Sequence, residues 1–177
     1  PNGNENYKAG SNQSVSWVAT SVTTVQAYYS LNNGSSWTAI GSPVPAANGT
    51  VSWDIDANTQ VSNAALVRVE DVASPTVVYD NSNATFGVIA AFDITHPESG
   101  DVVIAEDPYN ITWTKKGLGV SDVFLEYSTD SGTNWTAVVA GNATVPNTGT
   151  YYWSSVPGGA LSSFCKIRVT DLNNVNA

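Results

Sequence analysis

An internal repeat constrains this chain more than any other feature. Val15-Ser-Trp17 returns 96 residues later as Ile111-Thr-Trp113, and Trp53 returns 100 residues later as Trp153. Two insertions of two residues each account for the drift, and all six tryptophans fall into pairs, three in each copy. Self-similarity of this kind is typical of one folding unit used twice. The sequence therefore predicts two similar modules, residues 1–89 and 90–177.

Both copies are predicted to consist of β-strands. Apolar and polar residues alternate with period two, turn residues separate the runs about every 10 residues, and no segment has a helical period. The prediction is all-β: two tandem immunoglobulin-like or fibronectin III-like antiparallel β-sandwiches. The positions predicted to point into the cores are Val15, Trp17, Ala19, Val25, Ala27, Tyr29, Val51, Trp53, Ile55, Ala65, Val67 and Val69 in the first copy, and Ile111, Trp113, Val123, Leu125, Tyr127, Tyr151, Trp153, Cys165, Ile167 and Val169 in the second.

The two ends of the chain are out of phase with the repeat. Pro1 aligns with Pro97, so the first copy has no counterpart of the opening strand predicted around residues 92–95. Ala177 aligns with Val77, so the second copy has no counterpart of the closing segment 78–89. Open sheet edges are paired, covered or blunted in native proteins. Two interpretations follow: a window on a longer covalent array, or a subunit that borrows a strand from its neighbour.

Charge and residue counts exclude several classes of function. A formal charge of −9 and a pI near 4.1 leave no basic patch for nucleic acid or an anionic membrane. No apolar run reaches the roughly 18 residues of a membrane helix. With one Cys and one His, the chain alone builds no disulfide, zinc cluster or Ser-His-Asp triad with a spare His. We therefore predict no catalytic residues, no nucleic-acid partner and no membrane insertion; catalysis would need a partner chain to complete a site.

A string of motifs carries a family resemblance. Residues 1–10, Val15-Ser-Trp17, Tyr29-Ser30, Asn33-Gly34, Trp37, Trp53 and Val67-Arg-Val-Glu-Asp71 together resemble the Ig-like repeats of large secreted and cell-surface proteins of bacteria. A related pattern occurs in fungal wall-associated Ser/Thr-rich domains. The resemblance implies an extracellular β-sandwich used as a spacer, adhesive or structural module. It implies no particular ligand, and the second copy departs from it at its more acidic start.

A hairpin motif recurs in both copies. Residues 128–135, Ser-Thr-Asp-Ser-Gly-Thr-Asn-Trp, resemble the Asp-box of sialidase propellers and other β proteins, and residues 30–37 repeat it with Asn32 in place of the Asp. An Asx side chain that binds backbone amides, and a Gly with positive φ, build a turn, so a structural role is expected. Only two arginines, Arg68 and Arg168, are available. They are predicted to point outward and to pair across strands with Glu70 or Glu126.

Acidic residues at the start of the second copy form the candidate cation site. Oxygen-rich loops bind Ca²⁺ when six or more oxygens converge, although the spacing here matches no known calcium loop. Solvated acidic loops are the competing interpretation, and no sign of a cleft supports a glycosidase pair of carboxylates. Ca²⁺ is thus the only cofactor considered, and its candidate ligands are Glu98, Asp101, Glu106 and Asp107.

Outward aromatic residues form the candidate glycan site. Tyr28, Phe124 and Tyr152 fall on the outward parity of their strands, where aromatic rings stack on sugars or contact neighbouring modules. Cys165 takes the slot of Ala65 and is predicted to be a buried, inert thiol. His96 has no His or Cys partner and is predicted to lie in an exposed loop.

Composition adds candidate modification sites. Ser, Thr and Asn make up 56 of the 177 residues, a content that permits O-glycans. Seven Asn-x-Ser/Thr sequons qualify for N-glycosylation if the host modifies secreted proteins, namely Asn12, Asn33, Asn48, Asn83, Asn110, Asn134 and Asn142.

Two hypotheses on function follow. The first is a non-catalytic structural module of an extracellular fibre, sheath or cell-surface array, which associates end to end by strand complementation or as part of a longer covalent repeat. The alternative is a carbohydrate-binding or adhesive module of a secreted protein, with the outward aromatics on the glycan. Both place the chain outside the cell, and the first makes its partner another copy or repeat of the same protein.

Overall fold

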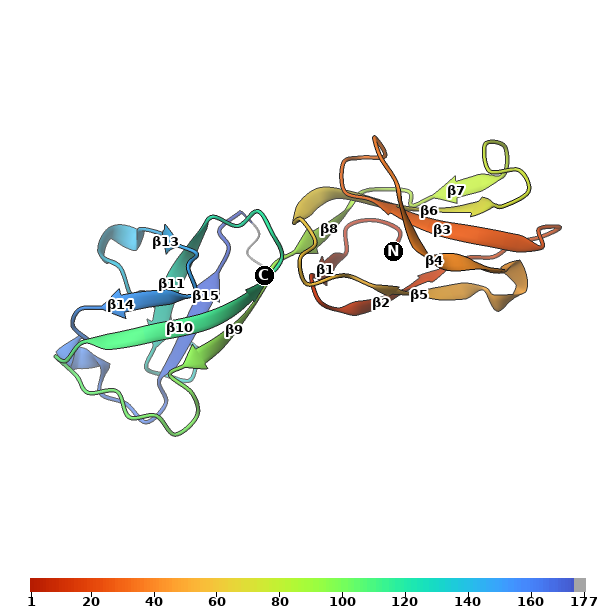
Figure 1. The fold of residues 1–177 in the computed structure, drawn as a ribbon. Helices are drawn as coiled ribbons and strands as arrows, with labels where there is room; N and C mark the ends of the chain where they lie inside the picture. The colour runs from red at the N-terminus through yellow and green to blue at the C-terminus, as the bar shows by residue number, and fades with distance from the viewer. Residues whose placement is uncertain (174–177) are drawn as a thin grey trace. The chain divides into compact units, whose positions relative to one another are not determined.

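The computed structural model describes residues 1–173 and is built of β-strands with three short 3₁₀ turns (Figure 1). The chain divides into two compact units, residues 1–89 with 116–118, and residues 90–115 with 119–177, of which 174–177 lie outside the described residues. In the part of the chain described, no helix has the length and apolar character that crossing a membrane requires.

The first unit contains two sheets that face each other across one core. The larger sheet has the order β1-β8-β6-β3-β4 with β7 also paired to β6, and the smaller sheet is the pair β2-β5. The strands of this unit are β1 (Asn6–Lys8), β2 (Asn12–Ser16), β3 (Thr24–Ser30), β4 (Thr38–Pro45), β5 (Thr50–Asp54), β6 (Ser62–Asp71), β7 (Tyr79–Asn81) and β8 (Phe86–Ile89), and the turn η1 (Ala46–Asn48) precedes β5.

The second unit has the same architecture with a different set of strands. One sheet has the order β14-β10-β9, and the other has the order β12-β11-β13 with β15 also paired to β11. The elements are β9 (Ala91–His96), β10 (Tyr109–Lys116), β11 (Asp122–Ser128), β12 (Thr136–Ala137), η2 (Ala140–Asn142), β13 (Val145–Pro146), β14 (Thr150–Trp153), η3 (Gly158–Ala160) and β15 (Lys166–Thr170).

Each unit is an immunoglobulin-like β-sandwich, which confirms the predicted fold class. Strands such as β11, with Val123 and Leu125 fully buried, alternate inward apolar and outward polar residues because side chains on a strand have a period of two. One pair departs from the predicted antiparallel arrangement: β1 runs parallel to β8. It is fixed there by the ring of Tyr7, which packs edge-on against Phe86 with 5.6 Å between centroids.

The two cores are separate clusters around equivalent tryptophans. Trp53 is 3% exposed in the first unit and Trp153 is 7% exposed in the second. The predicted inward positions are buried or half-buried with two exceptions, Ala19 and Cys165. Ala19 is exposed because β2 ends at Ser16, so the strand alternation no longer fixes the side chains that follow.

Candidate functional site

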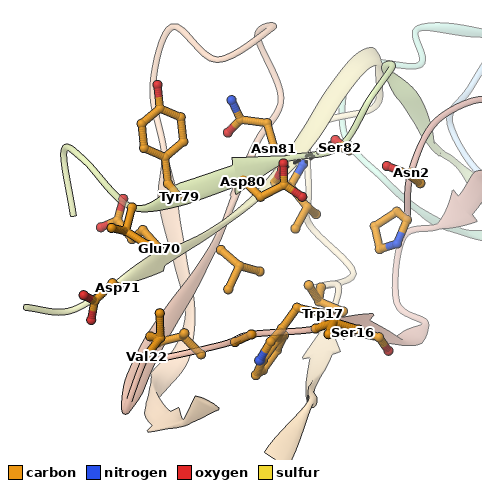
Figure 2. A pocket seen from close by; sticks show the side chains of 18 of the residues that line it. Asn2, Ser16, Trp17, Val22, Glu70, Asp71, Tyr79, Asp80, Asn81 and Ser82 are labelled. Atoms are coloured by element: carbon orange, nitrogen blue, oxygen red, sulfur yellow. Dashed lines mark hydrogen bonds between the residues drawn. The ribbon is translucent and has the colours of Figure 1, made fainter. Parts of the chain in front are cut away.

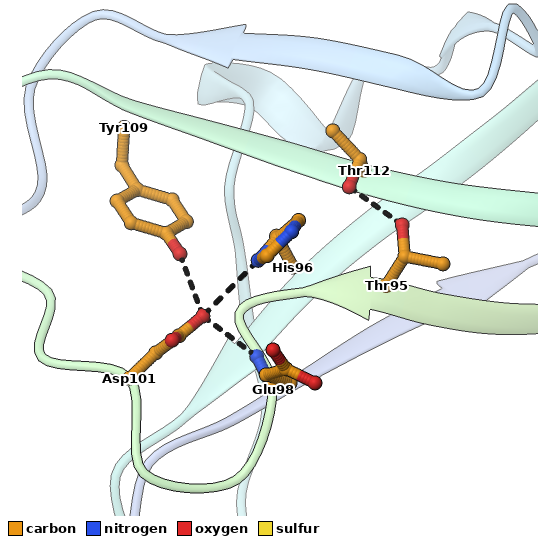
Figure 3. A network of polar contacts seen from close by, with 6 residues as sticks. All are labelled: Thr95, His96, Glu98, Asp101, Tyr109 and Thr112. Carbon is orange, nitrogen blue, oxygen red and sulfur yellow. Dashed lines mark hydrogen bonds and ion pairs between the residues drawn. The ribbon is translucent and has the colours of Figure 1, made fainter.

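The predicted acidic cation site is divided between two places. Glu98 and Asp101 come together with His96, and one ligand atom from each lies within 4.8 Å of the others (Figure 3). Glu106 and Asp107 do not belong to this group. The main chain of Glu106 instead bonds to Val156, with 2.7 Å between N and O.

Asp101 is the centre of a hydrogen-bonded network in this group. Its Oδ2 accepts bonds from the backbone N–H of Glu98 at 2.9 Å, the hydroxyl of Tyr109 at 3.2 Å and Nδ1 of His96 at 3.3 Å. These bonds, the backbone one foremost, lower the pKa of Asp101, whereas burial and then Asp101 raise the pKa of Tyr109. Two carboxylates and one imidazole fall short of the six or more oxygen ligands that Ca²⁺ prefers.

The three outward aromatic residues are divided between the two units, Tyr28 in the first and Phe124 and Tyr152 in the second. Tyr28 lies on β3, Phe124 on β11 and Tyr152 on β14, and these strands belong to three different sheets. Tyr152 is 62% exposed, whereas Tyr28 and Phe124 are half-buried. Burial, and next its hydrogen bond to Glu70, raise the pKa of Tyr28. A stacking platform within the second unit would need Phe124 and Tyr152 on one sheet, and they lie on different sheets.

All seven sequon asparagines are exposed. Two of them have amide nitrogens engaged in side-chain hydrogen bonds. Nδ2 of Asn134 donates to Asp130 at 2.6 Å, and Nδ2 of Asn12 donates to Ser52 at 2.7 Å. A glycan on either nitrogen would therefore compete with a contact that orders its turn or strand pair.

The two hairpin motifs build similar turns with three hydrogen bonds in common. In the second copy, Oγ of the buried Ser128 accepts from the backbone N–H of Gly132 at 2.8 Å and donates to Asp130 at 2.7 Å, while Asp130 Oδ1 accepts from the N–H of Asn134 at 2.8 Å. Ser30, Asn32, Gly34 and Ser36 repeat the same contacts. The side chains satisfy backbone donors within the turn, as expected for a structural motif.

The arginines lie over the tryptophans of these hairpins. The guanidinium carbon of Arg68 is 4.3 Å from the ring centroid of Trp37, and that of Arg168 is 4.3 Å from that of Trp135. Arg168 also pairs with Glu126, with 2.5 Å between Nη2 and Oε2, as the sequence predicted for this copy. Arg68 instead bonds to Asn81 at 2.9 Å, because β7 brings that amide opposite it.

Asp130→Asn is expected to flatten the acid dependence of stability. Bonds from the backbone N–H of Asn134 and the hydroxyl of Ser128 hold the pKa of Asp130 at about 2, below its ordinary value of 3.8. A carboxyl with a lowered folded-state pKa stabilises the fold above its unfolded pKa and loses that contribution as the pH falls through about 2. Denaturant titrations between about pH 4 and pH 2 measure the slope. The first copy has Asn32 at this position, so the amide fits, and equal slopes for both proteins would contradict the expectation.

Cys165 is exposed, so the prediction of a buried thiol is wrong. The aligned Ala65 is 0% exposed because Phe86 of β8 pairs directly opposite it. Among the described residues, β15 pairs only with β11 and no strand lies beside Cys165 in this way. The prediction assumed equal neighbours in both copies, and the copies differ here.

A groove runs along the open side of the small sheet in the first unit. It has a volume of about 550 Å³ and is lined by residues 14–20 on one side and by residues of β6, β7 and the segment between them on the other; we call it the first groove. Figure 2 shows Ser16 and Trp17 across from Asp80 and Ser82. Its lining is mixed, with Val15, Val67 and Val69 among the apolar residues and Glu70, Asp71 and Asp80 among the polar ones.

The equivalent edge in the second unit carries a strand. There β9 lies beside β10, with 2.6 Å between the hydroxyls of Thr95 and Thr112 (Figure 3), and Phe92 and Ile94 pack against the core. Thr112 aligns with Ser16 in the repeat, so the first groove follows the line that β9 takes in the second unit.

A larger groove lies in the second unit. We call it the second groove; its volume is about 710 Å³, and it is lined by Ile94, residues 97–103, Tyr127, Trp153, Val156, residues 160–163 and residues 165–167. Leu161 on its rim is 78% exposed. Of these residues, Glu98 and Asp101 were predicted as cation ligands, and no groove was predicted here. The unmatched ends of the repeat were the signal that could have located both grooves.

Comparisons with known proteins give low similarity. No protein-family model matches the chain, and no curated protein does. Among solved structures, the chain is similar to the fibronectin(III)-like modules of Clostridium thermocellum CbhA, at 15% identity over 99% of this chain and 85% of that one, with a TM-score of 0.30. It is also similar to the N-terminal four Ig domains of Dscam1 isoform 6.9, at 13% identity over 96% of this chain and 40% of that one, with a TM-score of 0.38.

Proposed function

We propose that this chain is a non-catalytic structural module of an extracellular fibre, sheath or cell-surface array, and that it associates with further copies or repeats through open sheet edges. The observation that carries the proposal is the first groove. It lies along β2, which pairs with β5 and with no other described strand, whereas the equivalent β10 has neighbours on both sides.

The chemistry of β2 favours strand addition. Its five residues, Asn-Gln-Ser-Val-Ser, contain no charge and no proline, so the edge lacks the usual features that prevent pairing. Main-chain hydrogen bonds from an added strand would give affinity, and apolar side chains at alternate positions would enter the groove over Val15, Val67 and Val69.

Composition and surface chemistry support a place outside the cell. The chain is rich in uncharged Ser, Thr and Asn, and all seven sequon asparagines are exposed. Tyr28, Phe124 and Tyr152 lie on three different sheets, which favours the structural module over the alternative, a carbohydrate-binding module.

An added strand tests the proposal. Residues 91–96 are fused ahead of Pro1, which aligns with Pro97, so the added strand enters in the register that β9 has before Pro97. We expect the melting temperature to rise by about 2–4 °C for each kcal/mol that the buried strand contributes. In the control, serines replace the two apolar residues copied from Phe92 and Ile94. Equal melting of both fusions and of the parent chain would contradict the proposal.

A further inference from the structure

The surroundings of Trp153 in the second unit lack one aromatic ring that Trp53 has in the first unit. In the first unit, Phe86 of β8 is 2% exposed and packs edge-on against Trp53, with 6.0 Å between ring centroids. Trp153 aligns with Trp53 and likewise packs on a tyrosine, Tyr127, at 5.3 Å. Among the described residues, no aromatic ring packs against Trp153 as Phe86 packs against Trp53. Trp153 therefore lines the second groove.

The positions that would pair with such a strand also line this groove. In the first unit, β6 and β8 run antiparallel, with Ala65 opposite Phe86 and Ser62 opposite Val88. The aligned residues of the second unit are Cys165 and Ser162, and both line the second groove. The register that β8 has on β6 is therefore available on the segment that leads into β15.

The side chains at these positions are more exposed in the second unit than in the first. Ala65 is 0% exposed, with Phe86 of β8 opposite it, and Val67 two residues later is 4% exposed. The aligned Cys165 is exposed and Ile167 is half-buried. The second unit thus exposes, at Cys165, the position that β8 covers at Ala65 in the first unit.

The surroundings of the two arginines also differ, at the place where β7 lies in the first unit. Arg68 lies between two rings, Trp37 at 4.3 Å and Tyr79 of β7 at 4.7 Å. Arg168 lies over Trp135, and no second ring stacks on it among residues 1–173. An incoming segment with a tyrosine seven residues before its aromatic anchor, as Tyr79 precedes Phe86, would complete this stack.

We propose that the second groove binds an extended strand of the β8 type from another repeat of this kind. The strand runs antiparallel to β15, with an aromatic side chain opposite Cys165 and against Trp153, and with an aliphatic side chain two residues later opposite Ser162. Residues 84–90, Ala-Thr-Phe-Gly-Val-Ile-Ala, contain no charged side chain, so such a strand leaves no unpaired charge in the groove. The inference rests on the proposed function, because it names the donor strand of the same kind of assembly.

Cys165 reports on the occupancy of the groove. It is the only cysteine of the chain, and it is exposed in the wall of the groove. The rate at which iodoacetamide alkylates the protein therefore reports on this one position. A synthetic peptide of residues 79–90 is added to the complete chain. At a peptide concentration about ten times its Kd, we expect the alkylation rate to fall about tenfold. The control peptide carries serine in place of Phe86, and we expect it to leave the rate unchanged.

A covalent version keeps the inference testable if the free peptide binds too weakly. Residues 78–89 are fused after Ala177, which aligns with Val77, and the control fusion again has serine at the Phe86 position. Protection of Cys165 in the first fusion alone supports the proposal. Equal alkylation rates in both fusions and in the parent chain would overturn it. This readout is independent of the fusion ahead of Pro1, so either proposal can fail without the other.

Discussion

Trp113→Ala is expected to lower the free energy of unfolding by about 3–5 kcal/mol, as large truncations of buried aromatic residues do. Trp113 is 3% exposed in the core of the second unit. Its Nε1 donates to Oδ1 of Asn147 at 3.0 Å, and Asn147 is itself buried. The substitution removes a ring from the core and leaves a buried acceptor without its donor, and the second effect accounts for about 1–3 kcal/mol of the expected loss. Urea denaturation of the complete chain measures the change.

Two companion variants separate these effects. Trp113→Phe retains a buried aromatic ring but not the donor, so its loss of stability sets an upper limit on the contribution of the hydrogen bond. Val18→Ala lies at a side chain that is 99% exposed and is expected to change stability by less than about 0.5 kcal/mol. Stability of Trp113→Ala within that same margin would show that the ring does not contribute to the core as the structure places it.

Phe86→Ala is expected to cost about 3–5 kcal/mol in the first unit, because the ring is almost completely buried between two others. Phe86 packs edge-on against Trp53 and Tyr7, with centroid distances of 6.0 and 5.6 Å. The truncation opens beside Trp53 the kind of space that already exists beside Trp153. We expect quenching of tryptophan fluorescence by acrylamide to increase together with the loss of stability.

Phe86→Leu is the matched control for this prediction. Leucine retains most of the apolar volume at the position without the edge-on ring geometry, and we expect it to lose less stability than alanine does. If the alanine variant melted like the parent chain, Phe86 would not be an anchor for β8. The proposal that a strand of the β8 type fills the second groove would then lack its aromatic anchor.

The local features of the fold could be predicted from the sequence. Alternation of apolar and polar residues located the strands, since it follows directly from side-chain geometry within one strand. The Asx-Gly hairpins formed as expected because all their contacts lie within four residues of each other. The pair of Arg168 with Glu126 was also predictable, because these residues lie directly opposite each other on β15 and β11.

The candidate sites could be predicted only in part. Of the four acidic residues proposed for a cation, Glu98 and Asp101 lie close together, because they are only three residues apart. Glu106 and Asp107 lie elsewhere, because the loop that contains them follows its contacts with Val156. The outward parity of Tyr28, Phe124 and Tyr152 gave no information on which sheet each strand joins.

Cys165 illustrates the difference between the two kinds of information. The sequence alone determined the repeat, the strands and the two tryptophan-centred cores, because these depend on periodicity and on contacts that each copy contains. Only the tertiary structure decided which sheet edges are covered, and therefore that Ala65 is buried and the aligned Cys165 is exposed. Burial at an edge depends on the neighbouring strand, and a residue's own sequence context contains no record of whether that neighbour is present.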